Sequence, residues 1–246
     1  MTYFEGFIVP VPEGNKDAFA KHANSLSALL KEVGVERQAE AWASDVPEGK
    51  LTDFNKAVNA APGEKTVFAW FEYADRAARD AANQRMMTDP RMEAMGVDVP
   101  FDGKRMVLGG FEAIVEEGAP GGNYVDGFVV PVPTQKREAY RALAAKMATV
   151  FREHGASRVV EAFGDDVQHG EVTDFYRAVQ AVEGEGIVFS FIEWPDKATR
   201  DQAWGKIMSD DSMKPDGGMP FDGKRMFWGG FEKVIDTAKS RAAADA

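Results

Sequence analysis

The 246-residue chain has 29 Lys and Arg against 40 Asp and Glu, a net charge of −11, which disfavours nucleic acid and membranes as partners because anionic surfaces bind through cationic contacts. It has no cysteine, which excludes disulfides, thiolate nucleophiles and thiolate metal sites. No apolar stretch approaches the length of a membrane span, and residues 1–12 lack a basic region before their apolar run, so we expect a cytoplasmic protein without a signal peptide.

Six main elements are predicted in the first part of the chain, in the order strand, helix, strand, strand, helix, strand. They cover residues 4–11, 18–33, 36–44, 67–73, about 75–87 and 105–115. Apolar residues at helical spacing define the first helix, which Gly34 ends, and Asp75 is a candidate N-cap for the second. Residues 54–58 are ambiguous between a strand and one helical turn capped by Thr52 or Asp53.

The second part of the chain repeats the first. The block at 3–12 returns at 124–133, and the block Pro-Phe-Asp-Gly-Lys-Arg-Met at 100–106 returns at 220–226. Two copies of one domain in one chain imply a fused dimer. We expect a first domain at 1–117, a glycine-rich linker at 118–122, a second domain at 123–236 and a flexible tail at 237–246, which lacks large apolar side chains.

Each half has the βαββαβ order of a ferredoxin-like domain. The strand at 67–73 is largely apolar on both faces, with Ala69 and Phe71 on one and Phe68 and Trp70 on the other. An antiparallel sheet with one solvated face would alternate instead, so both faces must be covered. We expect helices on one face and the sheet of the other half on the second, which makes an α+β protein of two tandem halves that form an intramolecular dimeric α+β barrel. Such a pseudo-dimer would be a monomeric chain.

Several segments carry a resemblance to a known family. They are 40–50, 68–73, 86–92 and 124–130, and the closing block with its Gly-Gly-Phe-Glu ending at 100–112 and 220–232. On these segments both halves resemble the YbaA-like proteins, a bacterial family of unknown function. The resemblance implies the dimeric α+β barrel superfamily, which includes cofactor-independent monooxygenases, dehydratases, haem-using relatives and ligand-binding regulators, and it transfers no established activity. The chain departs from the single-domain form by its fusion, and from the family pattern at 211–215.

The histidines do not follow the repeat. None of His22, His154 and His169 has a histidine at the matching place in the other half, so histidine is not expected to be the catalyst of a site that both halves share. No group of histidines and acids has metal-ligand spacing on one element, and no loop matches a phosphate or dinucleotide motif. We therefore expect no metal and no cofactor, and dependence on haem or metal is the weakest alternative.

Glutamates on the predicted strands do follow the repeat. The matched pairs are Glu40 and Glu161, Glu72 and Glu193, and Glu112 and Glu232. Burying a carboxylate without a partner is expensive. For Glu72 the favoured interpretation is an ion pair with Arg37, Arg105 or Lys104, and the other is a carboxylate in an apolar pocket that is suited to proton transfer. We expect Glu72 and Glu193 to be buried and to contact a basic side chain or a hydrogen-bond donor.

Glycine pairs at 109–110 and 229–230 interrupt the last strand of each half. Glycine inside a strand marks a bulge or the close approach of another group. We favour this structural interpretation over a contact with a ligand.

The candidate ligand-binding residues are carboxylates and aromatics at matched positions. They are Glu40, Trp42, Trp70 and Glu72 in the first half, and Glu161, Phe163, Phe191 and Glu193 in the second. Glu40 and Trp42 share one face of their strand, and with Trp70 opposite they would line a cleft. We expect any pocket to lie between sheet and helices within a half. Because phenylalanine replaces tryptophan twice in the second half, the two clefts should differ, and the first half is our choice for the functional site.

Two kinds of function fit these residues. The leading hypothesis is a small-molecule ligand, aromatic or amphipathic, that binds in an apolar cleft and undergoes proton abstraction or oxygen insertion without a cofactor; no catalytic residue is assigned. The alternative is a non-catalytic ligand-binding or protein-interaction module. A pocket into which Glu40 or Glu72 is exposed would favour the enzyme. A solid core with every glutamate paired would favour the module.

Overall fold

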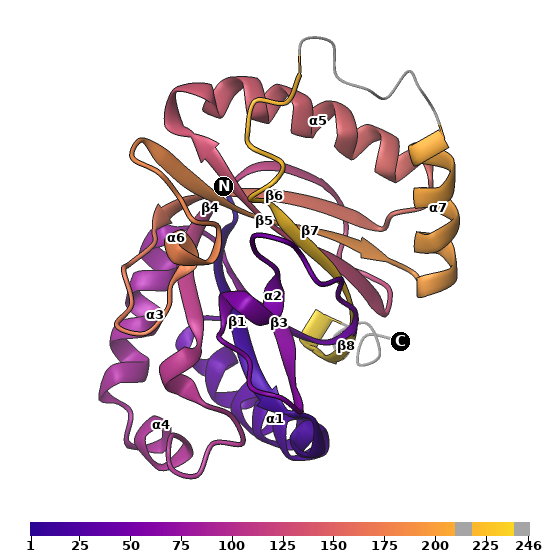
Figure 1. The fold of residues 1–246 in the computed structure, drawn as a ribbon. Helices are drawn as coiled ribbons and strands as arrows, with labels where there is room; N and C mark the ends of the chain where they lie inside the picture. The colour runs from indigo at the N-terminus through magenta and orange to yellow at the C-terminus, as the bar shows by residue number, and fades with distance from the viewer. Residues whose placement is uncertain (210–217, 239–246) are drawn as a thin grey trace.

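The computed structural model describes residues 1–209 and 218–238 (Figure 1). The first half consists of β1 (Tyr3–Pro12), α1 (Lys16–Val33), β2 (Arg37–Asp45), α2 (Phe54–Ala57), β3 (Glu64–Tyr73), α3 (Arg76–Thr88), α4 (Pro90–Met95) and β4 (Val107–Gly118). The second consists of β5 (Tyr124–Pro133), α5 (Arg137–Glu153), β6 (Arg158–Asp166), α6 (Phe175–Ala178), β7 (Glu185–Trp194), α7 (Lys197–Ser209) and β8 (Phe227–Asp236). Short 3-10 turns cover Glu13–Asn15, Gly103–Arg105 and Thr134–Lys136. The divergent segment at 211–215 lies outside the described residues, as does the expected tail beyond Ala238.

The eight strands form one closed antiparallel barrel in the order β1-β3-β2-β8-β5-β7-β6-β4. Each half contributes four neighbouring strands with its first and third strands in the middle, which is the ferredoxin-like order. The two sheets are also hydrogen-bonded to each other along both edges, where β2 pairs with β8 and β4 pairs with β6. The expected α+β barrel within one chain is confirmed, and the edge pairing leaves no open strand edge in it.

The helices lie on the outside of the barrel, as Figure 1 shows for α1 on one side and α5 on the other. The long helix α1 contacts β1 and β2 of its own half and β8 of the other half. Its counterpart α5 contacts β5, β6 and, across the halves, β4. The predicted stop of α1 is confirmed, because Gly34 has a φ of 115° and donates its N–H to the carbonyl of Leu30.

The ambiguous segment at 54–58 forms a helical turn and not a strand. The side chain of Asp53 caps α2 by accepting the N–H of Lys56. Asp75 caps α3 in the same way, as predicted. The turn α2 contacts its counterpart α6, and the hydroxyls of Thr52 and Thr173 donate to carbonyls of the opposite half.

The barrel interior is filled with aromatic side chains from both halves. Phe68 stacks on Phe189 with ring centroids 4.6 Å apart, and Trp70 stacks on Phe191 at 4.2 Å. This packing explains why β3 and β7 are apolar on both faces: one face meets the helices and the other meets the opposite sheet.

The glycine pairs of β4 and β8 have the structural role that was expected. The pairing of β4 with β6 shifts register between Gly110 and Phe111. A Cβ on Gly110 would lie 2.4 Å from the hydroxyl of Tyr3, and one on Gly230 would lie 2.2 Å from that of Tyr124. Glycine is therefore required where the tyrosine crosses the strand.

Candidate functional site

The predicted site residues separate onto the two faces of the sheet. On β3, Trp70 and Glu72 point into the barrel together with Phe68. On β2, Glu40 and Trp42 point outward toward α1. The cleft that would have joined Trp70 to Glu40 and Trp42 does not exist, because the sheet lies between them.

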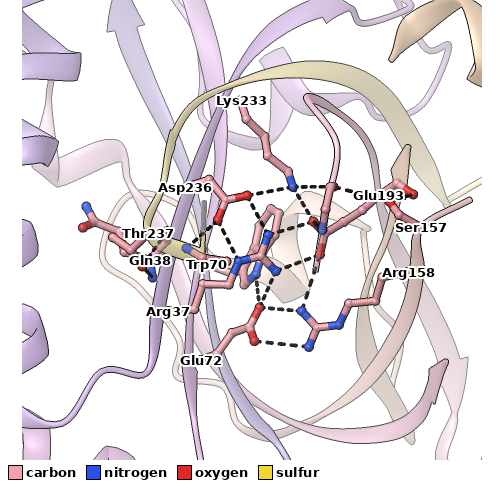
Figure 2. A network of polar contacts seen from close by, with 12 residues as sticks. Arg37, Gln38, Trp70, Glu72, Ser157, Arg158, Glu193, Lys233, Asp236 and Thr237 are labelled. Carbon is pink, nitrogen blue, oxygen red and sulfur yellow. Dashed lines mark hydrogen bonds and ion pairs between the residues drawn. The ribbon is translucent and has the colours of Figure 1, made fainter. Parts of the chain in front are cut away.

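The inward glutamates are fixed by arginines at one end of the barrel (Figure 2). Arg37 donates two hydrogen bonds, of 2.8 and 2.7 Å, to Glu193 of the other half. Arg158 donates to Glu72 in the reciprocal way, at 2.7 and 3.2 Å. The indole of Trp70 also donates to Glu72 at 2.9 Å. The prediction that both glutamates are buried and paired is confirmed. Arg37 also donates to Glu72 at 2.9 Å, so it is the correct choice among the three proposed partners of Glu72.

Three further charged residues complete this network. Asp236 accepts two hydrogen bonds from Arg37 and one from Lys233, and Arg158 also donates to Glu116 at 2.6 Å. Lys233 and the backbone N–H of Gly121 both donate to Glu193. Burial by itself raises the pKa of Glu193, but the hydrogen bond from Arg37 and the charge of Lys233 outweigh it and hold that pKa at about 2. Glu193 therefore stays ionised at neutral pH and holds the two halves together.

Two of the predicted aromatics do not line a pocket. Trp70 and Phe191 are fully buried and stacked on each other inside the barrel. Their assignment to a pocket between sheet and helices was wrong, because a strand that is apolar on both faces does not reveal which face is inside.

The outward group in the first half borders a cavity of about 100 Å³ between the sheet and α1. It is lined by Phe7, Val9, Phe19, His22, Ala23, Leu26, Glu40, Ala69, Phe71, Phe101 and Met106. The cavity is where a pocket was expected, between sheet and helices of one half. Trp42 packs next to it, with its ring 6.4 Å from that of Phe19, and is not part of the lining.

Glu40 is the carboxylate of this cavity and is only 7% exposed. Burial raises its pKa to about 7, against which the hydrogen bond from Gln38 acts. The amide of Gln38 donates to Oε1 at 2.6 Å, and no other donor in residues 1–209 and 218–238 bonds to the carboxyl group. Within that described part of the chain, Glu40 thus has one oxygen anchored and one without a partner, at the wall of an apolar cavity.

Gln38 is itself oriented by its neighbours. It donates a second hydrogen bond to the carbonyl of Ala23 at 3.0 Å and accepts one from the hydroxyl of Ser27 at 2.7 Å. Ser27 borders a second cavity, of about 200 Å³, on the other side of Gln38. The sequence did not point to Gln38, because an amide on a strand has no signature of its own.

His22 was also missed as a member of the site. It lies on the turn of α1 that faces the cavity, with its ring 6.0 Å from that of Phe101. Burial lowers its pKa below the usual value. The argument from the repeat excludes histidine only from a site that both halves share. A site that is present in the first half alone needs no matching histidine in the second.

The second half arranges the same face differently. Glu161 accepts a hydrogen bond of 2.7 Å from the hydroxyl of Tyr140, and Ser190 provides another donor that favours its ionised form. Burial nevertheless raises the pKa of Glu161 to about 7. Phe163 packs under the guanidinium of Arg137, which lies 4.9 Å from its ring. The two faces therefore differ in their polar contacts, whereas the difference expected from the sequence rested on the exchange of tryptophan for phenylalanine.

Two features are absent from residues 1–209 and 218–238. No three histidine or acidic side chains there are grouped so that they could hold a metal ion. No helix within the same residues is both long and apolar enough to cross a membrane.

Comparison with known sequences finds the same domain twice. The family described as "Protein of unknown function (DUF1428)" matches residues 2–103 and 123–223. The uncharacterised protein YbaA of Escherichia coli K12 is 54% identical over 117 residues, which are 48% of this chain and 100% of that protein. YbaA of Shigella flexneri matches to the same extent.

Comparison with solved structures finds the same fold in distant proteins. A provisionally named monooxygenase of Fusobacterium nucleatum superposes with a TM-score of 0.58 at 11% identity, over 96% of this chain and 93% of its own. A second protein with that provisional name, from Lactobacillus acidophilus, has a TM-score of 0.54 at 9% identity, over 96% and 95% of the two chains. At such identities the likeness concerns the fold alone.

Proposed function

The chain belongs to the DUF1428 family, of which it carries two copies, and from that premise we propose that its first half binds a small aromatic molecule in the cavity beside α1 and transfers a proton through Glu40. The observation that carries the proposal is the carboxyl group of Glu40. It is buried, it is anchored through one oxygen by Gln38, and it borders a cavity lined by four phenylalanines.

The chemistry follows from the environment of this carboxyl group. A general base works best when its pKa is near the working pH, and burial raises the pKa of Glu40 to about 7. Both forms of the group are then populated at neutral pH, so it can accept a proton and return it. The phenylalanines around it exclude water and favour a planar apolar ligand.

His22 is the second titratable group of the cavity lining. Burial lowers the pKa of His22, so its imidazole is neutral at neutral pH and can donate or accept a hydrogen bond. We assign to His22 the role of orienting the ligand at the entrance of the cavity, next to Phe101. Of the two reactions expected from the sequence, proton abstraction is supported by these residues. Oxygen insertion without a cofactor would begin with the same deprotonation.

A substrate of known chemistry tests this function without knowledge of the natural one. 5-Nitrobenzisoxazole opens its ring after losing a carbon-bound proton to a base, and the product is coloured. We expect the intact chain to catalyse this reaction with a rate that rises with pH through a midpoint near the raised pKa of Glu40. Glu40→Gln should remove the catalysis. Glu161→Gln, the matched change in the second half, should leave it nearly intact.

The alternatives predict different results. A rate that is the same in the Glu40→Gln variant, or a midpoint at the ordinary pKa of a glutamate, would contradict proton transfer at this site. Equal losses from Glu40→Gln and Glu161→Gln would instead indicate two equivalent sites. Binding of the substrate without turnover would favour the non-catalytic ligand-binding module.

A further inference from the structure

The two halves of the chain differ in what faces the outward glutamate. In the second half the hydroxyl of Tyr140, on α5, donates a 2.7 Å hydrogen bond to Oε2 of Glu161. The matching residue on α1 is Phe19, which has no hydroxyl and lines the cavity beside Glu40. The second half therefore contains a phenol bonded to its glutamate, and the first half contains a cavity.

The two halves also differ in the residue that lies next to the glutamate along its strand. Gln38 anchors Oε1 of Glu40 at 2.6 Å, whereas the matching residue in the second half is Val159, which has no donor. Glu161 has a second donor in Ser190, whose match in the first half is Ala69, which has no hydroxyl. The two carboxyl groups are thus bonded by different side chains and from different directions. In the first half, the donor comes along β2 and leaves the side toward α1 open.

From this comparison we propose that the ligand of the first-half cavity is a hydroxylated aromatic, a phenol or an enol on a ring, whose O–H donates to Glu40 as Tyr140 donates to Glu161. This inference rests on the proposed function and names its substrate class. The proton that Glu40 takes up is then the hydroxyl proton of the ligand, which leaves the electron pair on the ligand oxygen as a phenolate or enolate.

The lining agrees with such a ligand, and the volume limits how far it can enter. Phe19, Phe71 and Phe101 provide aromatic edges and faces for the part of the ring that enters. The cavity of about 100 Å³ is smaller than a cavity of about 150 Å³ that accepts benzene, so the hydroxyl end enters and the rest of the ring lies at the mouth. An ionised carboxylic acid is disfavoured, because its charge would face the carboxylate of Glu40.

The free side chain of tyrosine, 4-methylphenol, is the probe that tests the inference. Toluene differs from it only by lacking the hydroxyl. A hydrogen bond to a charged group corresponds to a factor of about 10 to 100 in Kd, so 4-methylphenol should bind more tightly than toluene by that factor. Met106 lines the cavity and Met226 is its match in the second half, so NMR signals of labelled methionine methyl groups can distinguish the halves.

We expect 4-methylphenol to shift the signal of Met106 and not that of Met226 in the intact chain. Phe19→Tyr should abolish the shift by supplying the hydroxyl from the protein. Tyr140→Phe should create a shift at Met226 by opening the second half. Tyr176→Phe removes a hydroxyl on α6, where the ring contacts His169 and does not line the cavity. It is the matched control and should change neither signal. The double variant Phe19→Tyr with Tyr140→Phe should move binding from Met106 to Met226, which also shows that both substitutions fold.

Failure of this inference can be told apart from failure of the proposed function. If toluene and 4-methylphenol bind equally, or if Phe19→Tyr leaves the shift of Met106 unchanged, the ligand class is wrong even where the ring opening of 5-nitrobenzisoxazole still depends on Glu40. The opposite result is a ring opening that is independent of Glu40, together with loss of 4-methylphenol binding in Phe19→Tyr. It would support the ligand class and contradict the transfer of a carbon-bound proton to Glu40.

Discussion

Phe68 and Phe189 stack face to face at the centre of the barrel, with ring centroids 4.6 Å apart and planes inclined by 7°. They occupy matching positions in the two halves, so the pseudo-twofold axis of the barrel passes between their rings. Gly6 and Gly127 lie beside the pair: a Cβ on Gly6 would come within 2.8 Å of Phe189, and one on Gly127 within 2.9 Å of Phe68. The glycine in each opening block is therefore explained by the stacked rings.

The first prediction follows from this contact. Gly6→Ala should lower the free energy of unfolding by about 1–3 kcal/mol, because the new methyl group overpacks a buried ring that has no room to move. Gly14→Ala is the control, since a Cβ there meets nothing within 4 Å. Urea unfolding of both variants measures the difference. Equal stabilities of the two would show that the aromatic stack adjusts without cost.

The second prediction concerns the charged network that joins the halves. Arg37→Met should cost about 3–5 kcal/mol, because it removes one of the two arginines that the buried Glu72 and Glu193 share. Arg91→Met is the control: Arg91 pairs with Glu32 and Asp89 at the surface, where such pairs contribute about 0–1 kcal/mol. Thermal or denaturant unfolding gives both values. Similar small losses in the two variants would mean that Arg158 and Lys233 keep the network neutralised without Arg37.

The barrel could be predicted from the sequence because it follows from two visible patterns. The repeat indicates two copies, and the strand at 67–73 is apolar on both faces, which requires a cover on each side. The pairing of β2 with β8 and of β4 with β6 could not be predicted in the same way. Edge pairing depends on backbone groups that every residue carries, so side-chain pattern does not select the partner.

The candidate site was predicted in part. Glu40 and Glu161 were identified because a carboxylate among apolar residues needs an explanation, and Glu40 does border a cavity. Trp70 and Phe191 were placed on the wrong face of the sheet. A strand whose apolar and polar residues do not alternate does not show which of its faces points into the barrel. The difference between Phe19 and Tyr140 is visible when the halves are aligned. The sequence does not show that both residues face the glutamate across the helix–sheet interface, and the effect of this difference on the site depends on that position.

The third prediction concerns the assembly of a single half. Residues 1–118 expressed alone should self-associate, because they expose Phe68 and Trp70 together with the free edges of β2 and β4. A dimer in which these edges pair between copies, as they do between halves here, is the expected product. Sedimentation of the fragment beside the intact chain, which we expect to be monomeric, measures this. A stable monomeric fragment would contradict the prediction.

The last prediction uses the pH dependence of stability to test the buried carboxyl groups. Burial raises the pKa values of Glu40 and Glu161 from 4.5 to about 7. Between these values the folded chain binds more protons than the unfolded chain, so the stabilisation is complete below about pH 4.5 and is lost as the pH rises through about 7. Each group should therefore lower the free energy of unfolding by about 3 kcal/mol across this window.

The low pKa values of Glu193 and Asp236, about 2 in both cases, have the opposite effect. Their stabilisation is lost as the pH falls toward 2, so it does not change between about pH 4.5 and 7. Burial also raises the pKa values of Glu5 and Asp126 and lowers that of His22, so Glu40 and Glu161 account for part of the change in this window. Glu40→Gln should reduce the decline in that window by about 3 kcal/mol, and the double change with Glu161→Gln should reduce it by about twice as much. Glu48→Gln, at a side chain that is 91% exposed, is the control. A decline that is as large in the double variant as in the unaltered chain would place the titrating groups elsewhere and remove the basis for proton transfer at Glu40.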